Sequence, residues 1–293
     1  MVAHIPPQFL YRYRPAETKY FAEEIERAVH RQEIYLTRIS DLNDPFEALP
    51  FVFQNSPREV REYLAKFERL FGRGVSISGI DFGEISRQRD IRKSKLRKLV
   101  GPSLESANNT VRILSVGMRH LRDQTAVACL SERWDSLLMW GHYGQSHKGV
   151  CVEYAPKIGI AAGERVGPLA MEYAEQRPTV TILELMELSA SAGNENKENF
   201  FDMARAERTF NSIAMTKPKE WEYEREWRIM KVGDDAADYF HVASLEPKSI
   251  LIGAKHSPET LDIVRKAVSG KIEIEVLSLD EKRFALRRNV SKP

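Results

Sequence analysis

Carboxylates and aromatic side chains are concentrated in one short segment, WEYEREWR (221–228). Its carboxylates are Glu222, Glu224 and Glu226, and in an extended chain they would share one face because successive side chains alternate. Clustered carboxylates repel one another, which raises the pKa of at least one unless a cation compensates. We therefore interpret Glu224 and Glu226 as candidate catalytic groups, although the same pattern also suits a solvent-facing edge strand.

A second segment, CLSERWDSLLMWGHYGQSHKG (129–149), combines a serine with aromatic residues and histidines. Ser131 ends a predicted strand, where a rigid scaffold can present a side chain to a cleft, and we count it as a candidate catalytic residue. His142 is a further candidate, and it fits a satisfied core histidine equally well. The spacing of His142 and His147 does not match the H-E-x-x-H pattern of zinc enzymes, so we predict no metal site.

The third segment, YLTRISDLNDPFE (35–47), contains a predicted turn at Asn43 and Asp44. Asparagine and aspartate favour turns because their side chains form hydrogen bonds with the neighbouring backbone. We expect this turn to shape or border a site built from the other two segments.

Composition limits the class of protein. The 293 residues are 42% hydrophobic, enough for a full core. Uncharged apolar runs such as 125–130 and 249–254 have the length of strands, well short of the roughly 20 residues of a membrane helix. The first residues do not resemble a secretory signal. The two cysteines do not suggest a disulfide framework, so we expect a cytoplasmic protein without membrane association.

One part of the chain is strongly basic. The net charge is only +2, but the run RQRDIRKSKLRK (87–98) carries seven Lys or Arg residues against one Asp. It is either a solvated helix face or a surface that attracts phosphate or nucleic acid. The wider region 57–122 is charged and helical in pattern, and we predict it to be a helical insertion or subdomain within a single domain, 1–293.

The order of predicted elements favours an α+β fold, with a mixed central β-sheet and flanking helices. A helix is predicted at 17–31, another after Asp135 as its N-cap, further helical stretches within 181–215, and a capped helix at 257–268. The predicted strands are 9–15, 33–39, 125–132, 148–156, 226–232, 249–254, 271–279 and 283–289.

Together these motifs resemble DUF2971, a bacterial family of unknown function. The resemblance covers nearly the whole chain, and it implies no established activity. The motifs that carry it are Tyr11-Arg12-Tyr13, Asn43 to Glu47, Ser131, Trp140, His142-Tyr143, His147-Lys148-Gly149, Trp221, Tyr223 to Arg228 and the strand 250–255.

The order of arginine, serine and Glu-x-Glu is also similar to the R-S-E layout of ADP-ribosyltransferases. That resemblance implies a related fold and NAD as a substrate, with no tightly bound cofactor. It makes Glu226 the carboxylate that faces the positively charged ribose and Glu224 the acceptor-facing one. Ser131 would position groups, but Glu132-Arg133 follows it where the layout has Thr-Ser. The ligand-binding set is Arg12, Tyr13, Asn43, Asp44, Trp140, Tyr143 and Arg228.

Two other functions remain open. One is a metal-dependent phosphodiesterase or nucleic-acid effector that uses Asp44, Glu47 and His142 with the glutamate pair, approached over the basic run 87–98. The other is a non-enzymatic ligand- or partner-binding module. An enzyme or ligand site is favoured if Arg12, Ser131, His142 and Glu226 converge on one cleft. Aromatic residues of a binding module would be Trp140, Tyr143, Trp221 and Trp227.

Overall fold

The computed structural model describes residues 5–53, 121–157, 168–181, 183–185, 203–233 and 237–289, with some positions between 56 and 81 and positions 118 and 188. The chain divides into two compact units. The first is Met1–Glu47, Arg122–Glu175 and Lys217–Pro293, and the second is Ala48–Leu121 and Gln176–Thr216. Most of the predicted insertion 57–122 and all of the basic run 87–98 lie outside the described residues.

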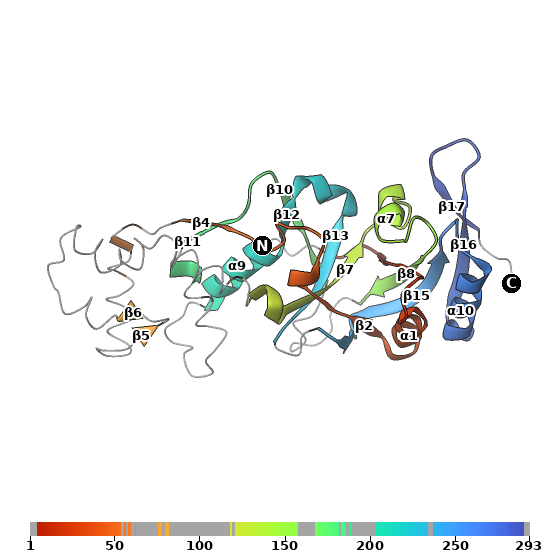
Figure 1. Ribbon diagram of the computed structural model, residues 1–293, viewed down its shortest axis with the longest axis horizontal. Helices are drawn as coiled ribbons and strands as arrows, with labels where there is room; N and C mark the ends of the chain where they lie inside the picture. The colour runs from red at the N-terminus through yellow and green to blue at the C-terminus, as the bar shows by residue number, and fades with distance from the viewer. Residues whose placement is uncertain are drawn as a thin grey trace. The chain divides into compact units, whose positions relative to one another are not determined.

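A nine-stranded sheet forms the centre of the first unit, in the order β17-β16-β15-β8-β1-β7-β13-β9, and β3 also pairs with β7 (Figure 1). Its one parallel pair is β15 with β16, joined by helix α10, and its other pairs are antiparallel. The predicted α+β fold with a mixed central sheet is therefore confirmed. The strands are β1 (Leu10–Arg14), β3 (Thr37–Arg38), β7 (Thr125–Ser131), β8 (Val150–Pro156), β9 (Leu169–Ala170), β13 (Glu226–Val232), β15 (Leu245–Ile252), β16 (Glu273–Leu279) and β17 (Leu286–Asn289).

Helices cover both faces of this sheet. On one face, Leu10 of β1 lies in a core cluster with apolar residues of α1 (Phe21–Glu26) and α10 (Pro258–Val268). On the other face, Tyr11 and Tyr13 pack with α7 (Leu137–His142). Strand β1 thus sends alternate side chains into two separate layers, as the period of two in a strand requires.

Capping explains where two of these helices begin. The Ser257 hydroxyl accepts a hydrogen bond from the Thr260 amide and caps α10, as predicted. Helix α7 is capped by Ser136, whose hydroxyl accepts from the Met139 amide at 3.3 Å. The prediction of Asp135 as this cap was wrong, because the Asp135 carboxylate instead pairs with Arg133.

Shorter elements complete the described residues. In the first unit they are the π-helical turn η1 (Arg27–Arg31), β2 (Glu33–Tyr35) paired with β14 (Tyr239–His241), η2 (Ile39–Asp41), β10 (Glu172–Ala174), which pairs with β12 (Thr216–Pro218), and the 3-10 helix η3 (Lys219–Glu224). In the second they are β4 (Phe51–Phe53) paired with β11 (Thr179–Thr181), β5 (Ser76–Ile77) paired with β6 (Ile80–Asp81), and α9 (Met203–Ala214). Within the described part of the chain, none of the helices has the length and apolar content to span a lipid bilayer.

Candidate functional site

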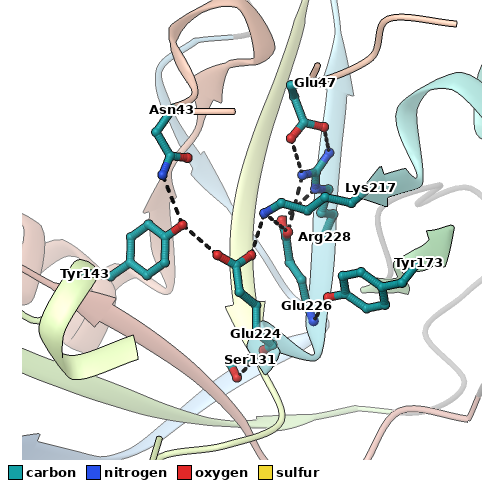
Figure 2. Close-up of polar contacts among 9 residues, drawn as sticks. All are labelled: Asn43, Glu47, Ser131, Tyr143, Tyr173, Lys217, Glu224, Glu226 and Arg228. Atoms are coloured by element: carbon teal, nitrogen blue, oxygen red, sulfur yellow. Dashed lines mark hydrogen bonds and ion pairs between the residues drawn. The ribbon is translucent and has the colours of Figure 1, made fainter. Parts of the chain in front are cut away.

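Five charged side chains meet on the α7 face of the sheet and form a continuous buried network (Figure 2). Each side chain is at most 5% exposed. Buried charges of this kind persist only where they are paired and hydrogen-bonded. The members of this network, which we call the ionic cluster, are Glu47, Lys217, Glu224, Glu226 and Arg228.

The local backbone explains how two glutamates of WEYEREWR join the cluster. The segment is not extended throughout, because η3 ends at Glu224 and Arg225 adopts a left-handed conformation with φ of 43° before β13 begins at Glu226. This reversal places Glu224 and Glu226 beside one cation, while Glu222 stays exposed to solvent. The expectation that all three carboxylates share one face applied only to an extended chain.

Arg228 is the fully buried centre of one half of the cluster. Its guanidinium donates to both oxygens of Glu47, at 2.6 and 3.0 Å, and its Nε donates to Glu226 at 2.6 Å. The predicted turn places Glu47 there, since Asp44 accepts a hydrogen bond from the Phe46 amide at 2.9 Å. Asp44 is itself buried, so this turn is part of the support beneath the cluster.

Lys217 links the two glutamates that flank Arg225. Its ammonium donates to Glu224 and, at 2.9 Å, to Glu226. Burial works to raise the pKa of Glu226, but the charges of Arg228 and Lys217 outweigh burial and hold that pKa well below its usual range. Glu226 is therefore an ionised carboxylate whose two oxygens are both held by cations.

Glu224 lies at the other end and behaves differently. Burial raises its pKa above the ordinary value, Lys217 opposes the rise, and the neighbouring charge of Glu226 adds to it. One Glu224 oxygen accepts from the Tyr143 hydroxyl at 2.6 Å, and Asn43 donates to that hydroxyl at 3.3 Å. Burial and the contact with Glu224 raise the pKa of Tyr143, so the phenol stays protonated and remains a donor.

A cavity of about 160 Å³ adjoins the cluster. The cavity opens at an interruption of the sheet. Strand β1 pairs with β7 only at Tyr11 and Ser131, and β3 pairs with another part of β7, at Val127 and Ala126. Side chains of both sheet faces therefore border it. Its lining includes Arg12, Asn43, Cys129, Tyr143, Glu224 and Glu226.

Ser131 is not among the residues that line the cavity, and its hydroxyl holds the backbone beside the cluster. Its hydroxyl donates to the Glu224 carbonyl oxygen and accepts from the Arg133 amide at 3.1 Å, and Ser131 is fully buried. These bonds tie the end of β7 to the junction between η3 and β13. Ser131 thus fixes the backbone from which Glu224 projects.

The predicted aromatic residues separate into core and surface. Trp140 is fully buried, donates to the Trp134 carbonyl and packs against Tyr13 and His147, so its ring is enclosed by protein. The Tyr13 hydroxyl donates to the Arg133 carbonyl at 2.6 Å. His142 is exposed on α7, with its ring 6.1 Å from that of Tyr223, and does not line the cavity.

Arg12 projects from the opposite face of the sheet to Glu226. It pairs in register with Val152, in the layer of α1, and its Nη2 donates to the Tyr35 carbonyl at 2.7 Å. Of the four residues expected to converge, Ser131 and Glu226 lie together, His142 lies outside, and Arg12 borders the same cavity from the other face.

Sequence reasoning missed two essential members of the cluster. Lys217 carried no motif signal, and Glu47 was considered as part of the motif Asn43 to Glu47 and as a metal ligand. A third residue, Tyr173, accepts a hydrogen bond from the Glu226 amide at 2.7 Å and was not singled out at all. Among the described residues, no group of three His, Cys, Asp or Glu side chains is arranged to hold a metal ion.

Fold and site together define an α+β protein with a buried ionic cluster beside a small cavity. The model of a family described as a protein of unknown function, DUF2971, matches residues 139–229. The resemblance drawn from the motifs is confirmed over this segment, which holds Tyr143, Lys217, Glu224, Glu226 and Arg228. Neither the search of curated proteins nor that of solved structures found a match.

Proposed function

We propose that the cavity beside Glu224 is an active site for a small polar ligand and that the chain is an enzyme. The supporting observation is a charge imbalance: three carboxylates in the ionic cluster share two cations. An uncompensated buried charge is costly. The cluster is therefore most stable when Glu224 either holds a proton or meets positive charge supplied from the cavity.

The position of Glu224 suits a reacting group. Its pKa is raised, mainly by burial, and an acid with such a pKa exchanges protons more readily near neutral pH. Tyr143 steadies one carboxylate oxygen with a hydrogen bond of 2.6 Å. Glu226 suits the role less well, because Arg228 and Lys217 already neutralise its charge.

For the reaction we put forward cleavage of the bond between nicotinamide and ribose in NAD. Nicotinamide leaves with the bonding electron pair as a neutral molecule, and positive charge develops on the ribose ring. The Glu224 carboxylate would stabilise that charge more in the transition state than in the ground state. Water or an acceptor hydroxyl then attacks the ribose carbon and gives its proton to Glu224.

The cavity size limits how NAD could bind. A volume of about 160 Å³ is below the roughly 300–1,000 Å³ of pockets that enclose drug-sized ligands. Only the nicotinamide and ribose end would enter, and the phosphates would stay outside. This moves the catalytic role from Glu226 to Glu224, with Glu226 and Arg228 as the charged support.

The test is nicotinamide release by the purified full chain supplied with NAD, followed by chromatography. We expect release by the wild type and its loss in Glu224→Gln with an unchanged circular dichroism spectrum. Glu222→Gln is the matched control, since Glu222 is an exposed carboxylate two residues away. A wild type that releases no nicotinamide, with water or with added acceptors, contradicts NAD cleavage. Binding of NAD without turnover would instead favour a ligand-binding module.

A further inference from the structure

Arg12 is a buried cation that forms no ion pair with any carboxylate among the residues that the structure describes. It is 7% exposed, and its Nη2 donates to a neutral acceptor, the Tyr35 carbonyl, at 2.7 Å. Its Nη1 has no hydrogen-bond partner among the residues that the structure describes. A guanidinium in this condition keeps its charge but is removed from solvent and bonds directly to no counterion, which is an unfavourable state for a buried ion.

The acidic residues on this face are already engaged. Both oxygens of Glu24 accept from Arg14, at 2.7 and 2.5 Å. Arg27 forms ion pairs with Glu23 and Glu33, each at 2.8 Å. Arg14 also places a second positive charge near Arg12. Burial, with Arg14 as the second cause, lowers the pKa of Arg12 to about 10, which still leaves it protonated at neutral pH.

A separate small cavity lies beside these arginines. Its volume is about 20 Å³, and both Arg12 and Arg14 line it, together with Glu24, Glu33, Tyr35, Tyr154 and Tyr239. A space of this size holds about one water molecule or one ion of similar radius, and it excludes phosphate or a carboxylate ligand. A water molecule could satisfy the Nη1 hydrogen but would leave the charge of Arg12 unbalanced.

We propose that a small monovalent anion of the size of chloride binds in this cavity, with Arg12 as its principal ligand. Glu24 attracts Arg12 electrostatically, but both of its oxygens bond directly to Arg14, and the anion would be the direct negative ligand of Arg12. The small cavity lies on the face of the sheet away from Glu224, and Arg12 also lines the larger cavity beside Glu224. Its consequence is a fold whose stability depends on halide concentration, because a ligand that binds only the folded state stabilises that state.

The experiment measures the thermal midpoint of the full chain in sodium chloride, sodium bromide and sodium gluconate at equal ionic strength. We expect a saturable rise in chloride and bromide that gluconate does not reproduce. In the same samples, the ³⁵Cl NMR line should broaden with protein, and bromide should reverse the broadening by competition. Equal midpoints in chloride and gluconate without line broadening would overturn the proposal and assign the cavity to water.

A variant localises the effect. Arg12→Met removes the charge while keeping most of the side-chain volume, and it should lose both the chloride-dependent rise and the line broadening. Arg31→Met is the matched control, since Arg31 belongs to the neighbouring turn η1 and pairs with Glu26, which does not line the cavity, and it should keep both. A chloride effect that survives in Arg12→Met overturns the assignment. If Arg12→Met does not fold, the wild-type comparison of anions decides alone.

Discussion

The two faces of the central sheet handle buried charge in opposite ways. On the α7 face, three carboxylates share two cations and Glu224 holds the excess. On the α1 face, Arg12 is a cation whose neighbouring carboxylates are bound to other arginines. A carboxylate can relieve excess charge by taking up a proton, whereas a guanidinium stays protonated and needs an anion. The first face therefore suits proton chemistry, and the second suits ion binding.

The largest expected effect on this comparison comes from Arg228→Met. It removes the cation between Glu47 and Glu226 and leaves two buried carboxylates facing each other, which should cost about 3–5 kcal/mol of unfolding free energy. Urea unfolding measures the loss. Arg225→Met is the control, because Arg225 is exposed and should change stability by less than about 0.5 kcal/mol. Similar losses for the two variants would contradict a cooperative ionic cluster.

A smaller effect separates the two glutamates of the cluster. Glu226→Gln should cost roughly 3 kcal/mol, because Arg228 and Lys217 lose the carboxylate that they share. Glu224→Gln should cost no more than about 1 kcal/mol, because the amide replaces a carboxylate whose charge is already disfavoured by burial. A larger loss of unfolding free energy in Glu224→Gln than in Glu226→Gln at neutral pH would contradict this difference between the two glutamates.

The pH dependence of stability should carry the signature of Glu224. Its folded-state pKa is raised, so its proton stabilises the fold at acid pH, and this contribution is lost as the pH rises from about 4.3 through the folded-state pKa. Glu226 has the opposite sign: its lowered pKa stabilises the fold above about 4.3, and this contribution is lost as the pH falls. As the pH rises from 4 to 8, the unfolding free energy of the wild type should therefore fall relative to that of Glu224→Gln. If the unfolding free energies of the wild type and the variant change with pH in parallel, Glu224 is not the titrating group.

The smallest expected effect concerns the hydrogen bond between Tyr143 and Glu224. Tyr143→Phe removes the hydroxyl that donates to Glu224 and should cost about 1 kcal/mol by urea unfolding. It should also raise the pKa of Glu224 further, because a hydrogen bond to the charged form is lost. Tyr223→Phe serves as the control: the half-buried Tyr223 ring lies beside that of His142, outside the cavity lining, and its hydroxyl should matter less.

Local patterns were sufficient to predict the elements that carry the site. Strand β13 spans Glu226–Val232, as its alternating sequence predicts, and Ser257 with Pro258 marks the start of α10. The same alternation implies that Arg12 and Tyr13 face opposite sides of the sheet. It does not reveal which side meets the glutamates, because that depends on which strands become neighbours.

Local sequence patterns could not predict which residues form the ionic cluster. Glu47 and Arg228 are 181 residues apart, so only the tertiary fold brings them together. Lys217 meets its glutamates because Arg225 takes a left-handed conformation, which arginine seldom adopts and no propensity predicts. Sequence reasoning therefore selected Glu224, Glu226 and the turn that holds Glu47, but it missed Lys217 and could not identify which carboxylate the cations leave in excess.

The most direct test of this account is the ionisation of Glu224 itself, followed by NMR titration of ¹³C-labelled glutamate carboxyl groups in the folded protein. We expect one glutamate that titrates well above the ordinary value of about 4.3 and whose signal disappears in Glu224→Gln. Glutamates that all titrate at or below that value would contradict it, as would an elevated signal that persists in the variant.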